Sequence, residues 1–182
     1  MPNNKNASVI ANEKINDTKV AKAAKIILDL QRQLKKYISK GYGPFLAAVY
    51  DSNGNLIAKS ANNVVSKSCS NNHAEINAIK LAEKKLGAYD LSPYNLSLYI
   101  TSEPCLMCLG AIMWSGIKAV YYGVPSDIVT KTTGFDEGFK PNWPNEFKKR
   151  GITVYGQIEM DAGKKVLQDY VTQGRTIYKP SK

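Results

Sequence analysis

The sequence is poor in cysteine and histidine and has no long apolar run. Its 182 residues include three cysteines and one histidine, too few for the disulfide framework of a small secreted domain. The longest apolar runs are too short to span a bilayer, which excludes a transmembrane helix. Residues 1–16 are polar and lack the apolar stretch of a signal peptide. We therefore expect a cytoplasmic protein that does not bind membranes.

Arginine is also scarce, although the formal net charge is +10. Only three of the 25 basic residues are arginines, and arginine is the side chain best suited to bidentate contacts with phosphates and bases. The net charge is +6 over residues 1–40, −1 over residues 41–147 and +5 over residues 148–182. We interpret the basic ends as solvated lysine faces of terminal helices rather than an RNA footprint, so a nucleic-acid partner is not favoured.

The hydrophobic pattern predicts a flexible arm over residues 1–16 and one domain over residues 17–182. Helices are expected at residues 17–39, 73–86, 104–115 and 161–171. Strands are expected at residues 46–51, 55–59, 96–101, 119–123 and 152–155, with a hairpin turn at Asn53-Gly54 and a long loop over residues 124–147. Because strands and helices alternate, we expect an α/β domain with helices on both faces of one sheet.

Four residues form a pattern that is typical of metal chemistry. His73-Ala74-Glu75 and Pro104-Cys105-Leu106-Met107-Cys108 both lie at expected helix starts, where free N–H groups and positive potential favour a thiolate. One imidazole and two thiolates suit Zn²⁺, and three protein ligands leave a position for water, as in catalytic zinc sites. Glu75, two positions after His73, can reach that water as a proton carrier without being a ligand.

Two other interpretations of these residues stay open. Cys69 lies four residues before His73, so a closed four-ligand site would make the zinc structural and the protein a non-enzymatic module. That arrangement leaves Glu75 without a role. A redox pair at Cys105 and Cys108 is the other alternative, but the sequence lacks a thioredoxin-like context, and His73 favours metal binding.

The order His-x-Glu followed by Pro-Cys-x-x-Cys is the signature of zinc nucleobase deaminases. Over about residues 43–139 the chain resembles the cytidine/deoxycytidylate deaminase superfamily, and within it the bacterial guanine deaminases. The zinc motifs carry the wider resemblance. Trp114 and Gly134-Phe135-Asp136-Glu137 carry the resemblance to guanine deaminases, because similar tRNA adenosine deaminases usually have His at the position of Trp114. Trp114 on its own would most simply be a core residue.

The resemblance implies a fold and an activity. The fold would be a three-layer α/β/α sandwich around one mixed, mostly five-stranded sheet, as in cytidine deaminases. One zinc ion per chain would be held by His73, Cys105 and Cys108, with Glu75 shuttling protons. The reaction would be hydrolytic deamination of a free purine base, in which guanine and water give xanthine and ammonia.

The resemblance also assigns contacts to the base. Asn62 would hold the ring carbonyl, and Phe45 and Trp114 would pack on the ring. Asp136 or Glu137 would accept hydrogen bonds from the ring N1–H and the exocyclic amine. These roles agree with elementary chemistry, since a carboxylate accepts from a donor edge and an apolar, aromatic pocket strengthens the few polar contacts inside it.

In guanine deaminases a tyrosine near the C-terminus also reaches the base, often in a homodimer with exchanged C-terminal segments. Tyr178, within a helix and tail at residues 156–182, is the candidate. The chain departs from the family pattern at Leu46, where glycine usually follows the phenylalanine, and at Glu137, where a second aspartate is usual. These departures keep guanosine, another aminated heterocycle and the adenosine of tRNA open as alternative substrates.

Overall fold

The computed structural model describes residues 17–179, so the arm expected at residues 1–16 lies outside the described residues. The helices of the described chain are α1 (Asp17–Ile38), α2 (Val64–Lys67), α3 (Ala74–Leu86), α4 (Leu106–Ser115), α5 (Ser126–Thr133), α6 (Trp143–Lys149) and α7 (Met160–Thr172). The strands are β1 (Leu46–Tyr50), β2 (Leu56–Ala61), β3 (Ser97–Ser102), β4 (Ala119–Val124) and β5 (Thr153–Tyr155). A short 3₁₀ turn covers Ser92–Tyr94.

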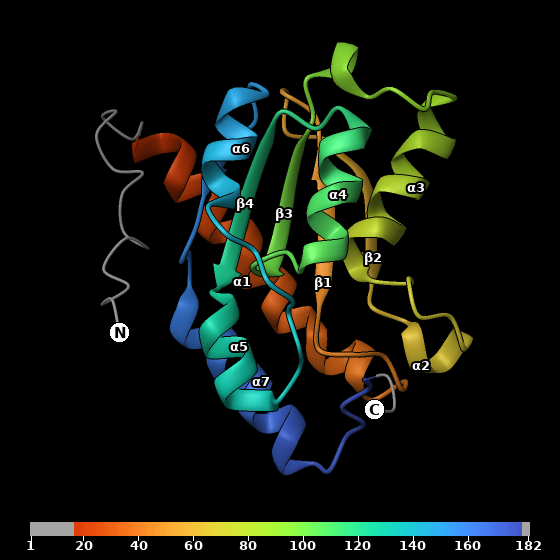
Figure 1. Cartoon of the computed structure of the whole chain (residues 1–182), viewed down its shortest axis with the longest axis vertical. Coiled ribbons are helices and arrows are strands. Elements are labelled where there is room, and N and C mark those ends of the chain that lie inside the picture. The colour runs from red at the N-terminus through yellow and green to blue at the C-terminus, as the bar shows by residue number, and fades with distance from the viewer. Residues whose placement is uncertain (1–16, 180–182) are drawn as a thin grey trace.

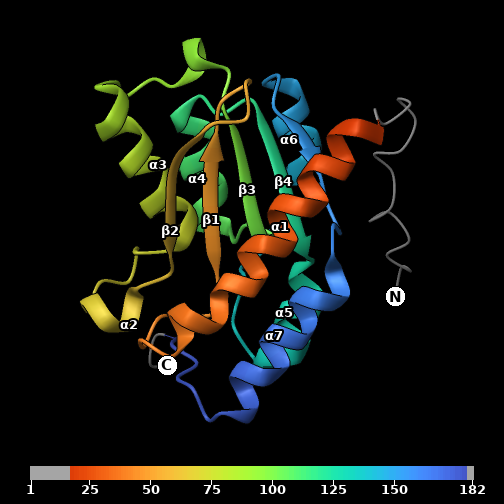
Figure 2. The same cartoon turned by 180° about the vertical axis from the view of Figure 1, so that it is seen from behind.

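The five strands form one mixed sheet in the order β2-β1-β3-β4-β5. The pairs β1–β2 and β1–β3 are antiparallel, whereas β3–β4 and β4–β5 are parallel. Helices α3 and α4 cover one face of the sheet (Figure 1), and α1 and α7 cover the other (Figure 2). The three-layer α/β/α sandwich expected from the sequence is therefore confirmed.

Local sequence explains where the first elements begin and end. One face of α1 is buried against the sheet through Ile27, Leu30 and Leu34, which recur at helical spacing. The helix gives way to Gly41, which has a φ of +83°, a conformation that glycine adopts at little cost. The expected Asn53-Gly54 turn joins β1 to β2, and Gly54 has a φ of +89°.

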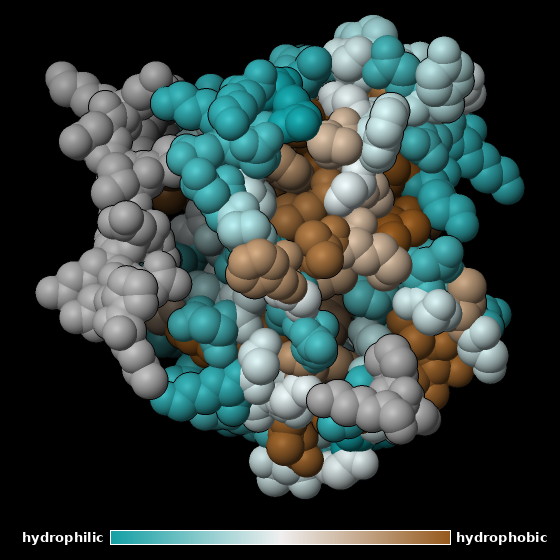
Figure 3. Space-filling view, in the orientation of Figure 1, coloured by the Kyte–Doolittle hydropathy of each residue, from teal (hydrophilic) through white to brown (hydrophobic). Residues whose placement is uncertain are grey.

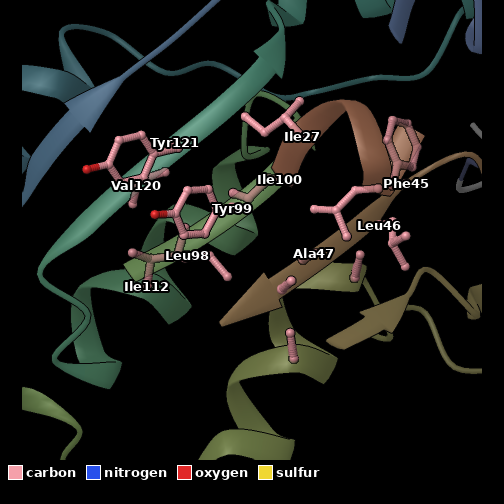
Figure 4. Packing of buried hydrophobic residues seen from close by; sticks show 14 of the residues in the cluster. Ile27, Phe45, Leu46, Ala47, Leu98, Tyr99, Ile100, Ile112, Val120 and Tyr121 are labelled. Carbon is pink, nitrogen blue, oxygen red and sulfur yellow. The ribbon is translucent and has the colours of Figure 1, made fainter. Parts of the chain in front are cut away.

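The core fills both sides of the central strands. Strand β3 is buried over nearly its whole length, as expected for a strand with helices on both faces. Figure 4 shows Leu98 and Ile100 of β3 among buried side chains contributed by the helices, including Ile27 of α1 and Ile112 of α4. This packing fixes α4, and therefore its first residues, relative to the end of β3.

The expectation of a long loop over residues 124–147 is wrong, because this segment contains α5 and α6. Helix α5 buries Val129 and Thr133 at i, i+4 spacing, and α6 buries Trp143 and Phe147 in the same way. Pro144 lies in the first turn of α6, where the missing N–H costs nothing. Only residues 134–142 of the expected loop lie between helices.

The sheet brings several chain segments to one end of the molecule. Strand β3 ends at Ser102, immediately before the turn that leads into α4. Strand β2 ends at Ala61, which is followed by Asn62.

No helix within residues 17–179 combines the length and the apolar character needed to cross a membrane.

Candidate active site

The three expected metal ligands lie at two helix starts that face each other. His73 precedes α3 and Cys105 precedes α4, both with extended backbone, while Cys108 lies in the first turn of α4. The Nδ1 atom of His73 is 3.4 Å from Sγ of Cys105 and 3.6 Å from Sγ of Cys108. The two sulfur atoms are 3.6 Å apart.

These separations fit a zinc ion. With Zn–S bonds of about 2.3 Å and Zn–N bonds of about 2.0 Å, a tetrahedral site has ligand–ligand edges of about 3.5–3.8 Å. Among the described residues, His73, Cys105 and Cys108 are the group whose ligand atoms all lie within 4.8 Å of one another. The donor set and its geometry therefore suit zinc with three protein ligands.

Cys69 lies outside this group. Its thiol instead donates to Oδ1 of Asn71 at 3.1 Å. The closed four-ligand site considered from the sequence is therefore not supported, and a fourth coordination position is left for a non-protein ligand.

The electrostatics of the site favour a thiolate at Cys105. The hydrogen bond from Cys108 and then the contact with His73 lower the pKa of the Cys105 thiol to about 4. The hydrogen bond to Cys105, together with burial, raises the pKa of Cys108. The pair therefore shares one proton, which a bound dication would displace because metal ligands must be deprotonated.

Glu75 lies in the first turn of α3, beside the ligand group. Its side chain is buried, with 5% exposure, and it lines the same cavity as His73 and Cys105. Burial, followed by the negative charge of Cys105, raises the pKa of Glu75 to about 7. A carboxyl group with a pKa near neutrality can both accept and release a proton during a reaction.

The ligand group opens into a cavity of about 680 Å³, within the range of small-molecule sites. Its aromatic walls come from Phe45, Phe135 and Tyr178. The ring centroids of Phe45 and Phe135 are 5.3 Å apart in an edge-on arrangement, and those of Phe135 and Tyr178 are 4.9 Å apart. The structure thus places Tyr178 in the cavity of its own chain. Leu46, the departure noted from the sequence, is fully buried in the core and does not line the cavity of the described chain.

Asn62 is only 1% exposed and is not among the residues that line the cavity within the described chain, but it contacts Tyr178, which is. Its Nδ2 donates to the hydroxyl of Tyr178 at 2.6 Å, and its Oδ1 accepts from the backbone N–H of Val64 at 3.3 Å. A Cβ at Gly43 would lie 2.8 Å from Oδ1 of Asn62. A side chain at position 43 would therefore clash with the side-chain amide of Asn62.

The two candidate carboxylates after α5 differ in their surroundings, although both line the cavity. Asp136 is exposed, and its Oδ1 accepts from the backbone N–H of Gly138 at 2.9 Å. Glu137 is more enclosed. Burial and the negative charge of Cys105 raise the pKa of Glu137 to about 8, against the opposing effect of Lys140.

The structure does not bring Trp114 into the cavity of its own chain. The side chain is 82% exposed and is not among the residues that line the cavity within the described chain. The reason is helical geometry: six residues at 3.6 per turn place Trp114 about 240° around α4 from Cys108, whereas the buried face carries Cys108, Leu109 and Ile112.

Asn77 was missed by the sequence analysis. Its Nδ2 lies 3.2 Å from the carbonyl of Ala61, 3.0 Å from Oδ1 of Asn63 and 3.1 Å from the carbonyl of Asn72. It therefore ties the segment carrying Asn62 to the segment carrying His73. The available signal was its position four residues after His73, on the same face of α3.

We expect the cysteines to differ in their effect on zinc content. Cys108→Ser should lose most of the bound zinc, because a thiolate ligand is replaced by a hydroxyl of far lower affinity. Cys69→Ser is the matched control and should keep one zinc ion per chain. Elemental analysis of the purified variants measures this. Equal zinc loss in both variants would show that Cys69 is a ligand after all.

Comparison with known proteins agrees with this geometry. Residues 19–124 match the family described as the cytidine and deoxycytidylate deaminase zinc-binding region. The chain is 41% identical over 102 residues to guanine deaminase of Bacillus subtilis, covering 56% of this chain and 64% of that protein. It is 33% identical over 132 residues to tRNA-specific adenosine deaminase of Haemophilus influenzae, covering 66% of this chain and 75% of that protein.

A solved guanine deaminase from Nitrosomonas europaea has the same fold, with a TM-score of 0.79 and 33% identity, covering 94% of this chain and all of that one. The chain spans slightly less than two thirds of the length of the Bacillus subtilis protein. The family match covers more than half of the chain and includes all three ligands and Glu75. The chain therefore belongs to the zinc-binding family of cytidine and deoxycytidylate deaminases.

Proposed function

We propose that this protein is a zinc-dependent deaminase of a free purine base and that guanine is its substrate, with xanthine and ammonia as products. One observation carries the proposal: a buried carboxyl group, Glu75, lies beside an open three-ligand metal group at the wall of an aromatic cavity. A structural zinc site needs no such proton carrier. The similarity to guanine deaminases supports guanine as the base.

Metal binding and proton transfer would be carried out by different residues. Zinc bound by His73, Cys105 and Cys108 would supply Lewis acidity that makes water a nucleophile at neutral pH. Glu75 accepts the proton of the attacking water and passes it to the ring nitrogen. It then takes up the proton of the newly attached hydroxyl group and gives it to the departing amine, so that the C–N bond breaks, ammonia leaves and the new C–O bond becomes a carbonyl.

Polar groups in the cavity wall and behind it would orient the base. Between the two candidate carboxylates we assign recognition to Glu137, because Asp136 is exposed and engaged with its own loop. Glu137 would accept hydrogen bonds from the donor edge of guanine, and Asn62 would donate to the ring carbonyl. Phe45 and Phe135 enclose the ring and exclude water.

An RNA-modifying adenosine deaminase is the alternative, favoured by the similarity to the Haemophilus influenzae protein. The charge of the cavity argues against it. Four residues with carboxyl groups line the cavity, Glu75, Glu103, Asp136 and Glu137, against one lysine, Lys179. Such a lining disfavours the phosphate groups that flank a nucleotide in RNA.

Release of ammonia from a panel of substrates tests the proposal. We expect turnover of guanine, and much slower or no turnover of adenine, cytosine, cytidine and tRNA, because the proposed acceptor Glu137 would meet the N1–H and amino donors of guanine. Coupled detection of ammonia with the zinc-loaded protein measures each rate. Turnover of tRNA without turnover of guanine would replace this proposal by its alternative.

We further expect Glu75→Ala to retain zinc and to lose about 10²–10⁴-fold in kcat, the usual contribution of a general acid–base group. Glu83→Gln changes a carboxyl group on the same helix, outside the cavity lining, and should leave kcat unchanged. Metal analysis and steady-state kinetics on guanine decide the matter. A Glu75→Ala enzyme with normal kcat would remove Glu75 from the mechanism.

We also propose that the protein is a homodimer that pairs through the exposed apolar face of α4. Figure 3 shows apolar surface over this part of the molecule. The exposed large apolar residues are Leu106 (53% exposed), Met107 (40%) and Trp114 (82%) of α4 and, from the loop between α5 and α6, Phe139 (82%). Leu106 and Met107 also line the cavity, so a second copy on this face would cover the rim of the cavity. This gives exposed Trp114 a role. Exchange of residues 156–182 is not needed to complete the site, because Tyr178 reaches the cavity of its own chain.

Trp114→Glu is expected to convert the dimer into a monomer, because it places a charge on the apolar face. Val171→Glu, at a position of α7 that is 39% exposed on the opposite side of the sheet, is the matched control and should remain dimeric. Light scattering coupled to gel filtration measures the mass. A monomeric unsubstituted protein at micromolar concentration would contradict the proposal.

A further inference from the structure

A buried lysine lies behind the cavity wall and has no part in the chemistry described above. The side chain of Lys140 is only 6% exposed. Its Nζ forms an ion pair with Oε1 of Glu103 at 3.0 Å and donates to the carbonyl oxygen of Pro104 at 2.8 Å. A third contact reaches the hydroxyl of Ser126. The three N–H groups of the ammonium therefore have three acceptors.

Both carboxylate oxygens of Glu103, the partner of Lys140, also accept hydrogen bonds. Its Oε1 also accepts from Nε1 of Trp143 at 2.8 Å, and its Oε2 accepts from the backbone N–H of Ser126 at 3.0 Å. A buried ion pair whose remaining hydrogen-bonding positions are filled is held in one geometry, whereas removal of one partner leaves an uncompensated charge. The Lys140–Glu103 ion pair therefore holds a single geometry in the structure.

The Lys140–Glu103 pair joins three chain segments beside the cavity. Glu103 and Pro104 precede the metal ligand Cys105, Ser126 begins α5, and Lys140 follows Glu137 on the loop between α5 and α6. Two bonds lead from these segments to Glu137. The hydroxyl of Ser126 lies 3.5 Å from Oε2 of Glu137, and the backbone N–H of Leu106 donates to the carbonyl of Glu137 at 3.0 Å.

The loop that carries Glu137 needs such an anchor. It has no helix or strand of its own between residues 134 and 142, and Gly134 and Gly138 both have positive φ. The Glu137 carboxylate also lies in the field of other acidic groups, since Cys105 and Glu75 both raise its pKa. A cation behind the wall offsets that repulsion and gives the carboxylate a preferred position.

We propose that Lys140 is a positioning residue for recognition of the base: held by Glu103, it fixes Glu137 at the cavity wall through the hydroxyl of Ser126. The inference rests on the proposed function, because it assumes that Glu137 binds the base. Lys140 itself does not line the cavity of the described chain.

The three contacts of Lys140 allow its positioning role to be separated from a structural one. The contacts with Glu103 and Pro104 hold backbone and ion-pair geometry, whereas the Ser126 hydroxyl is the branch that leads to Glu137. Ser126→Ala removes that branch and leaves the ion pair in place. Ser126→Thr keeps a hydroxyl and serves as the conservative rescue.

The experiment measures binding apart from turnover. In full-length protein carrying Glu75→Ala, the dissociation constant of 8-azaguanine is measured by calorimetry for Lys140→Met, Ser126→Ala and Ser126→Thr. Lys131→Met, at an exposed lysine of α5, is the matched control. Zinc content and thermal unfolding are recorded for every variant. The same substitutions in the protein with Glu75 intact give KM and kcat on guanine.

We expect Lys140→Met to weaken 8-azaguanine binding by about tenfold and Ser126→Ala by about three- to tenfold, as for a lost charge-assisted hydrogen bond. Ser126→Thr and Lys131→Met should bind like the parent protein, and zinc content should not change. On guanine, KM should rise more than kcat falls. If Lys140→Met does not fold, the Ser126 pair decides the outcome.

Unchanged affinity in folded, zinc-loaded Ser126→Ala would overturn the inference, and so would equal weakening by Ser126→Thr. Failure of the proposed function would look different, because the unsubstituted protein would then release no ammonia from guanine. An active protein whose Ser126 and Lys140 variants bind normally would contradict this inference alone.

Discussion

The approach of two helix starts is the constraint on which the rest of the site depends. Helices α3 and α4 pack side by side on one face of the sheet, and each begins with an extended residue that is a metal ligand, His73 or Cys105. Helix starts concentrate free N–H groups and positive potential, so they favour a thiolate and a carboxylate nearby. Glu75 reaches the site because it lies in the first turn of the same helix as His73.

The charge of the cavity explains which ligands it suits. Burial is the main cause that raises the pKa of Glu75 to about 7 and the pKa of Glu137 to about 8, so ionisation of both carboxyl groups calls for positive charge nearby. A dication at the three ligands and the ammonium of Lys140 are the compensating charges. A neutral base with N–H donors fits such a cavity better than a phosphate-bearing ligand, whose negative charge the carboxylates would repel.

The zinc centre could be predicted from the sequence, because each ligand lies in a short segment whose local structure the sequence determines. His73 and Cys105 stand at helix starts with recognisable patterns, and Glu75 follows from its offset within one turn. The α/β class followed from the alternation of strands and helices, whereas the strand order β2-β1-β3-β4-β5 comes from the structure. The site of Trp114 was not predicted, since the resemblance suggested a pocket contact whereas the rotation along α4 turns the side chain outward. Helices α5 and α6 were missed because Gly134 and Pro144 look like loop residues, although one ends a helix and the other begins one.

Residues such as Asn77 and Lys140 escaped prediction for a different reason. Their contacts depend on tertiary assembly. Asn77 meets the segment after β2, and Lys140 meets Glu103 across 37 positions of chain once β3, α4 and α5 are assembled. The metal ligands are held by helix starts and a sheet end, whereas Glu137 is held by side chains on a segment without regular structure. Because the proposed recognition of the base rests on Glu137, substitution in that segment is expected to change which base is bound while the zinc centre and Glu75 stay in place.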